Sequence, residues 1–168
     1  NQGESAELSS YLRSTGHQQV LSEEEADTAL VNTCVVIEPT ERKIMRRLRQ
    51  LRDDGKRLII VGCMASVGRE GLLKEFPGSL VCGTTEYPGF MAVLDQEIGK
   101  GTHLSKEPDA GTLILPIAQG CSGACTYCIT NLARGDLVSY PIDELLSKVR
   151  TALERGMKEV LVTSQDTA

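Results

Sequence analysis

The stretch Arg57-Leu58-Ile59-Ile60-Val61-Gly62 is a short aliphatic run that ends at a glycine and is followed directly by Cys63. A continuous apolar run of this length predicts a strand that is buried on both faces. Residues 41–54, which precede it, carry apolar side chains at helical spacing, and residues 28–33 form another short apolar run. A strand, a helix and a strand in this order predict a parallel sheet with helices packed on it.

The alternation of helices and strands continues on both sides of this stretch. We expect helices at 2–15, 67–75 and 87–98 and a further strand at 79–82. Together these segments predict an α/β domain with a parallel sheet over residues 1–99.

A polar, glycine-containing segment at 100–111 is interpreted as a linker to a second region at 112–168. In that region we expect a strand at 112–118, a long loop at 121–135, a helix at 141–155 and a strand at 158–163. One such unit cannot bury both faces of its sheet, so we expect either further sequence or cover from the first domain. The chain also starts inside an expected helix without an initiator Met, which indicates a fragment.

The composition is that of an ordinary globular protein. The 168 residues include 40% hydrophobic and 24% charged side chains, and the net charge is −5. This acidic balance argues against coating nucleic acid or an anionic membrane by bulk charge. No apolar run approaches the roughly 20 residues that span a bilayer, and no secretory signal is visible, so we expect a cytoplasmic protein without a membrane partner.

Half of the six cysteines lie within eight positions, in the loop Cys121-Ser-Gly-Ala-Cys125-Thr-Tyr-Cys128 after an expected strand. Three thiolates from one short loop can hold three irons of a 4Fe-4S cluster and leave the fourth iron open to another ligand. A structural zinc site needs a fourth ligand, and the nearest histidine, His103, lies in the linker. A disulfide would leave one thiol over. The spacing therefore favours the cluster over zinc and over structural thiols.

This loop resembles the Cys-x3-Cys-x2-Cys loop of the radical SAM enzymes, which follows the first strand of a partial β/α barrel. The resemblance implies a 4Fe-4S cluster on Cys121, Cys125 and Cys128 that binds S-adenosylmethionine (SAM). When an electron donor reduces the cluster, SAM is cleaved to a 5′-deoxyadenosyl radical. The resemblance also implies that Tyr127 lies beside the adenine of SAM; the alternative is a loop aromatic that covers the core.

Four segments are similar to successive strand ends of the methylthiotransferase domain that precedes a radical SAM core. They are Asn1-Gln2-Gly3-Glu4-Ser5, Val31-Asn32-Thr33-Cys34, Val61-Gly62-Cys63-Met64 and Cys82-Gly83-Thr84. The similarity implies a flavodoxin-like parallel-sheet domain over 1–99, truncated at its N-terminus, followed at 112–168 by the truncated start of a radical SAM partial (β/α) barrel.

The same resemblance implies a second 4Fe-4S cluster, with Cys34 and Cys63 at two of its three ligand positions. The third family ligand precedes the Asn1-Gln2 segment, so we expect it upstream of this chain. Cys34 and Cys63 each follow an expected parallel strand, which places both thiols at one edge of the sheet. Cys82 also ends a strand; we interpret it as a small buried core thiol, with cluster ligation as the alternative.

Residues 131–145 and 161–167 are most similar to the archaeal and eukaryotic threonylcarbamoyladenosine tRNA methylthiotransferases. This implies a transferase that adds a methylthio group to C2 of N6-threonylcarbamoyladenosine next to the anticodon, with SAM and two 4Fe-4S clusters as cofactors and tRNA as partner. The triplet Gln165-Asp166-Thr167 also resembles the branch that acts on an aspartate of a ribosomal protein. A non-catalytic iron-sulfur or zinc module is the alternative from another class. The fragment alone is expected to be inactive.

Two further features have two interpretations each. Arg134 either contacts substrate or SAM or fixes the loop as a hydrogen-bond donor. Residues 41–57 are strongly basic and either contact tRNA phosphates or form the solvated face of an amphipathic helix. The basic residues are Arg42, Lys43, Arg46, Arg47, Arg49, Arg52, Lys56 and Arg57.

Overall fold

The computed structural model describes residues 2–35, 38–99 and 111–167 of a mixed α/β chain with parallel strands. The chain divides into two compact units, which we treat separately. The three-stranded unit comprises Gln19–Gly99 and Cys125–Arg134. The two-stranded unit comprises Asn1–Gln18, Lys100–Ala124 and Gly135–Ala168. Of the expected linker, only Gly111 lies within the described residues, and His103 lies outside them.

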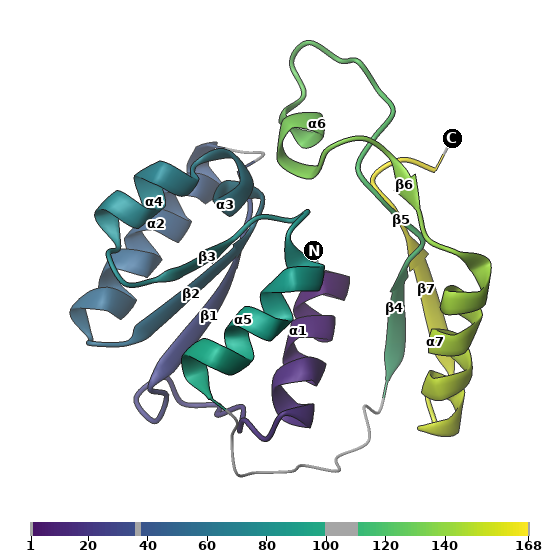
Figure 1. Ribbon diagram of the computed structural model, residues 1–168, viewed down its shortest axis with the longest axis horizontal. Helices are drawn as coiled ribbons and strands as arrows, with labels where there is room; N and C mark the ends of the chain where they lie inside the picture. The colour runs from purple at the N-terminus through teal and green to yellow at the C-terminus, as the bar shows by residue number, and fades with distance from the viewer. Residues whose placement is uncertain (1, 36–37, 100–110, 168) are drawn as a thin grey trace. The chain divides into compact units, whose positions relative to one another are not determined.

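The three-stranded unit contains the parallel sheet that the aliphatic runs predict. Strands β1 (Thr28–Thr33), β2 (Arg57–Gly62) and β3 (Leu80–Cys82) are parallel in the order β1-β2-β3 (Figure 1). The central strand β2 is the run with which the sequence analysis began, and it is buried from Leu58 onward because it has neighbours on both edges and helices on both faces.

The core of this unit follows from the alternation of side chains along β2. Leu58 and Ile60 pack in one cluster with Leu48 and Leu51 of helix α2 (Glu38–Asp53) and with one residue of α4 (Arg69–Glu75), Leu72. Figure 1 shows α2 and α4 on one side of the sheet and α5 (Tyr87–Ile98) on the other. The cluster also includes Phe76, which is almost fully buried.

Two helices in this unit differ from expectation. The helix expected at 67–75 is α4, which begins at Arg69; before it lies a short helix that the sequence did not predict, α3 (Cys63–Val67), which begins directly after β2 and is separated from α4 by Gly68. Helix α2 begins at Glu38, three residues before the expected start, since Pro39 fits the first turn of a helix.

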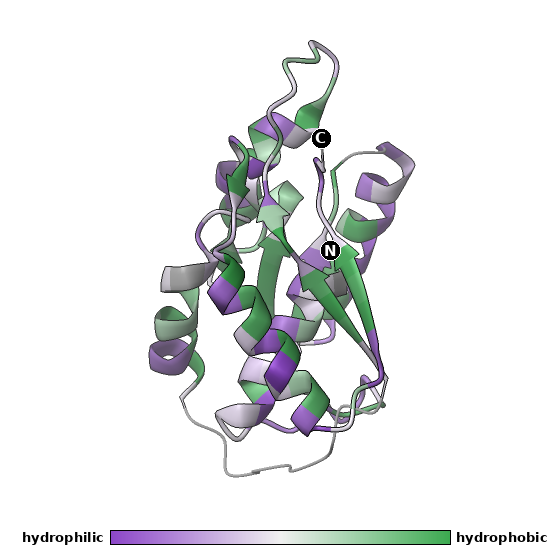
Figure 2. Cartoon of the chain, turned by 90° about the vertical axis from the view of Figure 1, so that its right-hand side faces the viewer, coloured by the Kyte–Doolittle hydropathy of each residue, from purple (hydrophilic) through white to green (hydrophobic). Residues whose placement is uncertain are grey.

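The two-stranded unit is built on a parallel strand-helix-strand motif. Strand β4 (Thr112–Pro116) pairs with β7 (Glu159–Thr163), and α7 (Ile142–Glu154) connects them. Helix α1 (Gln2–Ser14) packs on β4, where a Cβ at Gly3 would lie 2.9 Å from Pro116 Cγ. Figure 2 shows that the strands are strongly hydrophobic, yet every residue of β7 is exposed, as expected for a motif with little cover of its own.

The strand expected at 112–118 is interrupted. Ile117 donates its N–H to Thr163 and accepts the N–H of Tyr140, so the chain leaves β7 at this residue and turns to a new partner. The new pairing joins β5 (Ala118–Gln119) to β6 (Val138–Ser139) in an antiparallel bridge.

The expected loop at 121–135 also contains regular structure. Residues 129–134 form helix α6 (Ile129–Arg134), which belongs to the three-stranded unit. Across the three described ranges, no helix is both long enough and apolar enough to cross a membrane.

Candidate functional site

Cys34 and Cys63 lie at the carboxyl edge of the three-stranded sheet. Thr33 pairs with Gly62 in the β1–β2 register, and each cysteine is the next residue along its chain. Cys63 is buried as the first residue of α3, whereas Cys34 is partly exposed. The parallel order of the strands thus brings both residues to one edge of the sheet.

The carboxyl ends of β1 and β2, which directly precede Cys34 and Cys63, lie very close to each other. The Thr33 hydroxyl donates a 2.6 Å hydrogen bond to the carbonyl oxygen of Val61. Gly62 has φ +98°, and a Cβ placed on it would lie 2.4 Å from Asn32 Oδ1 and 2.5 Å from the Thr33 carbonyl oxygen. The segments that carry Cys34 and Cys63 therefore leave the sheet at a point where the ends of β1 and β2 are tightly packed against each other.

Cys82, the third cysteine at this edge, is a core thiol. Its side chain is fully buried, and its S–H donates to the Gly83 carbonyl oxygen at 3.3 Å. The pKa of this thiol is raised to about 12, mainly by burial and secondly by the nearby charge of Glu86, while Arg69 opposes the increase. Metals bind the thiolate form, so this environment favours the core interpretation of Cys82 over ligation.

The raised pKa of Cys82 predicts a pH-dependent stability. The thiol keeps its proton in the folded state up to pH about 12 but titrates near its ordinary value of 9.0 when unfolded. The folded state therefore binds more protons between these values, and the free energy of unfolding should fall as the pH rises above about 9. Urea unfolding at pH 7, 9 and 10 should show a smaller decrease for Cys82→Ala than for the original chain. Equal decreases would contradict the assignment.

The cysteine loop begins in the two-stranded unit at Cys121. Its N–H donates to the Gly135 carbonyl oxygen at 3.2 Å, and its sulfur accepts the N–H of Gly123 at 3.3 Å. The Cys121 thiol also donates to the Asp166 carboxylate at 3.6 Å. Asp166 accepts two further hydrogen bonds from Ser122, from the N–H at 3.0 Å and the hydroxyl at 2.7 Å. Asp166 thus holds the start of the loop, a role that the sequence motif alone did not indicate.

Cys125 and Cys128 lie in the three-stranded unit and are both exposed. The Cys128 N–H donates to the Cys125 carbonyl oxygen at 3.1 Å, which closes a turn between them. The pKa of Cys128 is lowered, first by a hydrogen bond from the Thr130 side chain and then by the backbone N–H groups of Thr130 and Asn131. These donors favour the thiolate, which is the metal-binding form.

The chemistry of these donors fits an iron-sulfur cluster, since the loop presents two exposed thiols and one of them has a lowered pKa. Among the residues that the structure describes, however, no three His, Cys, Asp or Glu side chains are gathered closely enough to hold a metal ion. The ligand assignments for Cys121, Cys125, Cys128, Cys34 and Cys63 therefore remain predictions.

Two other candidates in the loop have contrasting environments. The Tyr127 side chain is 90% exposed, so it does not cover the core and its ring is available to a ligand. Arg134 is only 6% exposed, at the end of α6. This burial favours the interpretation of Arg134 as a loop-fixing residue over that of a substrate contact.

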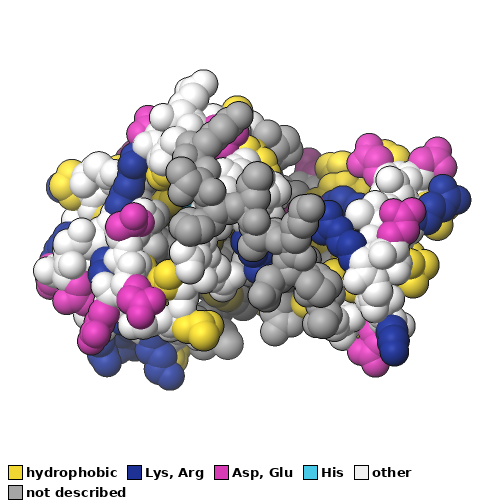
Figure 3. Space-filling view, turned by 90° about the horizontal axis from the view of Figure 1, so that it is seen from below, with side chains coloured by type: hydrophobic (Ala, Val, Ile, Leu, Met, Phe, Trp, Pro, Cys, Tyr) yellow, Lys and Arg dark blue, Asp and Glu magenta, His cyan; other side chains and the backbone are white. Residues whose placement is uncertain are grey.

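The basic segment at 41–57 is largely neutralised by carboxylates. The ion pairs are Arg42–Glu38, Arg47–Glu23, Arg49–Glu75, Arg52–Asp53 and Arg57–Glu97. Lys56 donates to the Ala26 carbonyl oxygen at 2.5 Å. Figure 3 shows Lys and Arg side chains interspersed with Asp and Glu on the visible face. The solvated-face interpretation is therefore favoured over phosphate contact.

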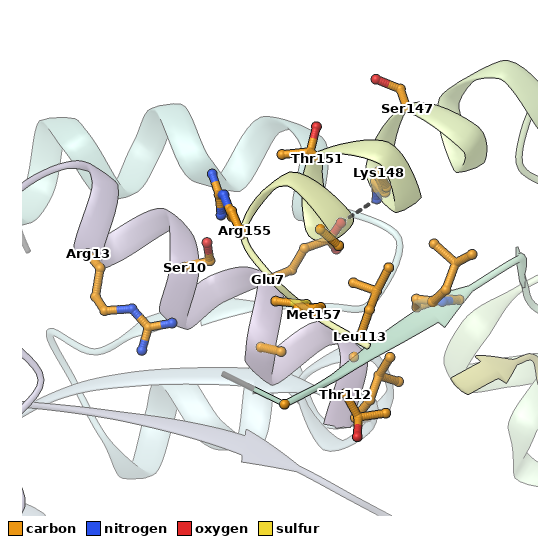
Figure 4. A pocket seen from close by; sticks show the side chains of 17 residues that line it. Glu7, Ser10, Arg13, Thr112, Leu113, Ser147, Lys148, Thr151, Arg155 and Met157 are labelled. Atoms are coloured by element: carbon orange, nitrogen blue, oxygen red, sulfur yellow. Dashed lines mark hydrogen bonds and ion pairs between the residues drawn. The ribbon is translucent and has the colours of Figure 1, made fainter. Parts of the chain in front are cut away.

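A cavity of about 480 Å³ lies in the two-stranded unit among α1, β4 and α7 (Figure 4), and Cys121 is not one of the residues that line it. Lys148 and Glu7 form a 2.5 Å ion pair in its wall. The charged groups that line it include this mutually neutralising pair, and we assign the cavity no function.

The amino-acid sequence of this chain is similar to that of several known proteins. Residues 1–83 match a family described as "Uncharacterized protein family UPF0004". A probable threonylcarbamoyladenosine tRNA methylthiotransferase of Pyrococcus horikoshii is 34% identical over 99% of this chain and 43% of its own length. One of the same name from Methanocaldococcus jannaschii is 34% identical over 94% of this chain and 39% of its length.

A second kind of relative is the ribosomal protein uS12 methylthiotransferase RimO of Escherichia coli, 31% identical over 94% of this chain and 38% of its own length. Over most of its length this chain is similar to methylthiotransferases of two kinds, which confirms the resemblance drawn from the strand-end and loop motifs. It spans about two fifths of the length of these relatives.

Proposed function

We propose that this chain contributes to a tRNA methylthiotransferase that adds a methylthio group to C2 of N6-threonylcarbamoyladenosine next to the anticodon. The observation that carries the proposal is the Cys121-x3-Cys125-x2-Cys128 loop, in a chain whose Cys34 and Cys63 share one sheet edge. In this proposal residues 1–99 form most of a flavodoxin-like methylthiotransferase domain, and residues 112–168 begin a radical SAM barrel. The protein would work in the cytoplasm with a reducing electron donor.

The choice of tRNA as substrate rests on the relatives. Those named for tRNA modification are 34% identical to this chain, and the one named for ribosomal protein uS12 is 31% identical. Modification of a ribosomal-protein aspartate is the second candidate. Transfer of a labelled SAM methyl group by the complete protein, to tRNA or to ribosomal protein, distinguishes the two substrates.

In this proposal Cys121, Cys125 and Cys128 hold one 4Fe-4S cluster, Cys34 and Cys63 bind a second, and Tyr127 lies beside the adenine of SAM. When bound, the first cluster supplies the electron and the SAM-binding iron of radical chemistry. The protein's own contribution is to present thiolates: the hydrogen bonds of Thr130 favour ionised Cys128, and Asp166 and Gly135 fix the backbone around Cys121.

Anaerobic reconstitution tests the cluster directly. Replacing Cys121, Cys125 and Cys128 together by alanine should remove about four irons and four sulfides per chain, since each cube contributes about four of each. The matched control is Cys82→Ala, which removes a thiol that is buried and protonated and should leave the iron content unchanged. SAM should alter the spectrum of the original chain and leave that of the triple variant unaltered.

Two outcomes would overturn the proposal. A triple variant with undiminished iron and sulfide would show that these cysteines are not the ligands. Zinc without sulfide in the original chain would instead support a non-catalytic zinc module.

A further inference from the structure

Helix α6 follows Cys128 and packs against α3, which begins at Cys63; both helices belong to the three-stranded unit. It has only six residues, and a helix of this length is not stable without tertiary contacts. Its last carbonyl groups also have no partner within the helix, and Ala133, which carries one of them, is buried. Some other part of the chain must therefore hold the end of α6.

Thr84, in the turn after β3, supplies that contact. Its hydroxyl donates a 2.6 Å hydrogen bond to the Ala133 carbonyl oxygen, and the Thr84 side chain is only 1% exposed. The backbone N–H of Thr84 donates to Ser66 Oγ on α3 at 2.9 Å, and the two hydroxyl oxygens lie 3.4 Å apart. One residue thus joins the carboxyl end of α6 to α3.

The turn that carries Thr84 is itself held in place. The Gly83 N–H donates to the Glu86 carboxylate at 2.8 Å, and Arg69 donates to the same oxygen at 2.6 Å. Gly83 also lies against α3, because a Cβ placed on it would be 3.0 Å from Ser66 Oγ and 3.2 Å from Ser66 Cα. The Thr84 hydroxyl therefore projects from a turn that is fixed on α3 and α4.

We propose that Thr84 is a positioning residue that holds the cysteine loop to the sheet edge: by capping α6 it fixes the segment that begins at Cys128 against the helix that begins at Cys63. The linkage joins two of the cysteine-bearing segments of the three-stranded unit, the one that begins at Cys128 and the one that begins at Cys63. The role of this linkage in iron-sulfur chemistry rests on the proposed function. The linkage itself, through which Thr84 joins α6 to α3, does not depend on that function.

The test compares Thr84→Val, which has nearly the same shape but no hydroxyl, with Thr84→Ser, which keeps the donor. In the metal-free chain, amide hydrogen exchange of residues 129–134 should accelerate about tenfold or more in Thr84→Val, because a buried carbonyl loses its donor. Thr84→Ser should restore slow exchange. Unchanged exchange of α6 in a folded Thr84→Val chain would overturn the proposal.

Thr33→Val is the matched control, because Thr33 also donates a buried 2.6 Å hydrogen bond to a carbonyl of this unit but does so within the sheet. It should lower global stability without selectively accelerating exchange in α6. If Thr84→Val does not fold, Ser66→Ala replaces it: this change removes the acceptor of the Thr84 N–H and should accelerate exchange of α6 about threefold. Unchanged exchange in Ser66→Ala would then overturn the proposal.

A second measurement separates this proposal from the proposed function. After reconstitution, a chelator should remove iron from Thr84→Val several times faster than from Thr84→Ser. If the chain binds no iron-sulfur cluster but α6 still loosens in Thr84→Val, the linkage stands and the proposed function fails. If iron binds and neither α6 exchange nor iron release responds to Thr84→Val, the linkage fails alone.

Discussion

Replacing Gly62 by alanine is expected to lower the free energy of unfolding of the three-stranded unit by about 3 kcal/mol or more. Gly62 has φ +98°, where side chains are strained, and the added Cβ would lie 2.5 Å from the Thr33 carbonyl oxygen. That oxygen belongs to the backbone of β1 and cannot rotate away, so β1 and β2 must separate at the edge that carries Cys34 and Cys63. Urea unfolding followed by circular dichroism measures the loss.

Two other glycines serve as controls for this substitution. Gly55 has φ +75° but open space around its Cβ position, so Gly55→Ala should show the backbone strain alone, at about 1 kcal/mol. Gly71 lies within α4 with open space at its Cβ position, so Gly71→Ala should stabilise the chain by about 0.5 to 1 kcal/mol. If Gly62→Ala lowers the free energy of unfolding by no more than Gly55→Ala does, then β1 and β2 do not approach each other as closely at Gly62 as the structure shows.

The sequence predicted the three-stranded sheet well because its signals are local. Each of the strands β1, β2 and β3 is recognised from a few consecutive apolar side chains, and the helices between the strands predict that they run parallel, as they do. Helices α3 and α6 were missed for the opposite reason. With five and six residues, they are too short to show a helical period, and packing elsewhere in the fold stabilises them.

The candidate site likewise has a part that the sequence predicts, the cysteines, and a part that only the folded structure reveals, the residues that hold them. Cysteine spacing identified the candidate ligands, but the residues that hold them depend on contacts between distant parts of the chain. Thr84 bonds to a residue 49 positions away, and Asp166 bonds to Ser122 over 44 positions. No local pattern specifies such pairs. The burial of Cys82, which separates it chemically from Cys128, likewise depends on the folded core.

Gly120→Ala is expected to open the base of the cysteine loop. Gly120 has φ +79°, and a Cβ on it would lie 2.0 Å from the Asp136 carbonyl oxygen and 2.6 Å from that of Gly135. Both oxygens are backbone atoms on the segment that leaves the loop, so the two segments must move apart. This movement breaks the hydrogen bond from the Cys121 N–H to Gly135 and disrupts the two-residue pairing of β5 with β6.

The expected result of Gly120→Ala is local, because β4 and β7 are joined by a separate five-residue pairing that does not include Gly120. Amide exchange at Cys121 and Tyr140 should accelerate about a hundredfold, equivalent to roughly 3 kcal/mol of local strain and overpacking, while β4 changes little. Gly156→Ala provides the control, since Gly156 has φ +86° in the same unit but nothing near its Cβ position. It should leave exchange at Cys121 unchanged. Equal exchange at Cys121 in the two variants would mean that this glycine does not close the loop, and that Asp166 alone holds Cys121 and Ser122 in place.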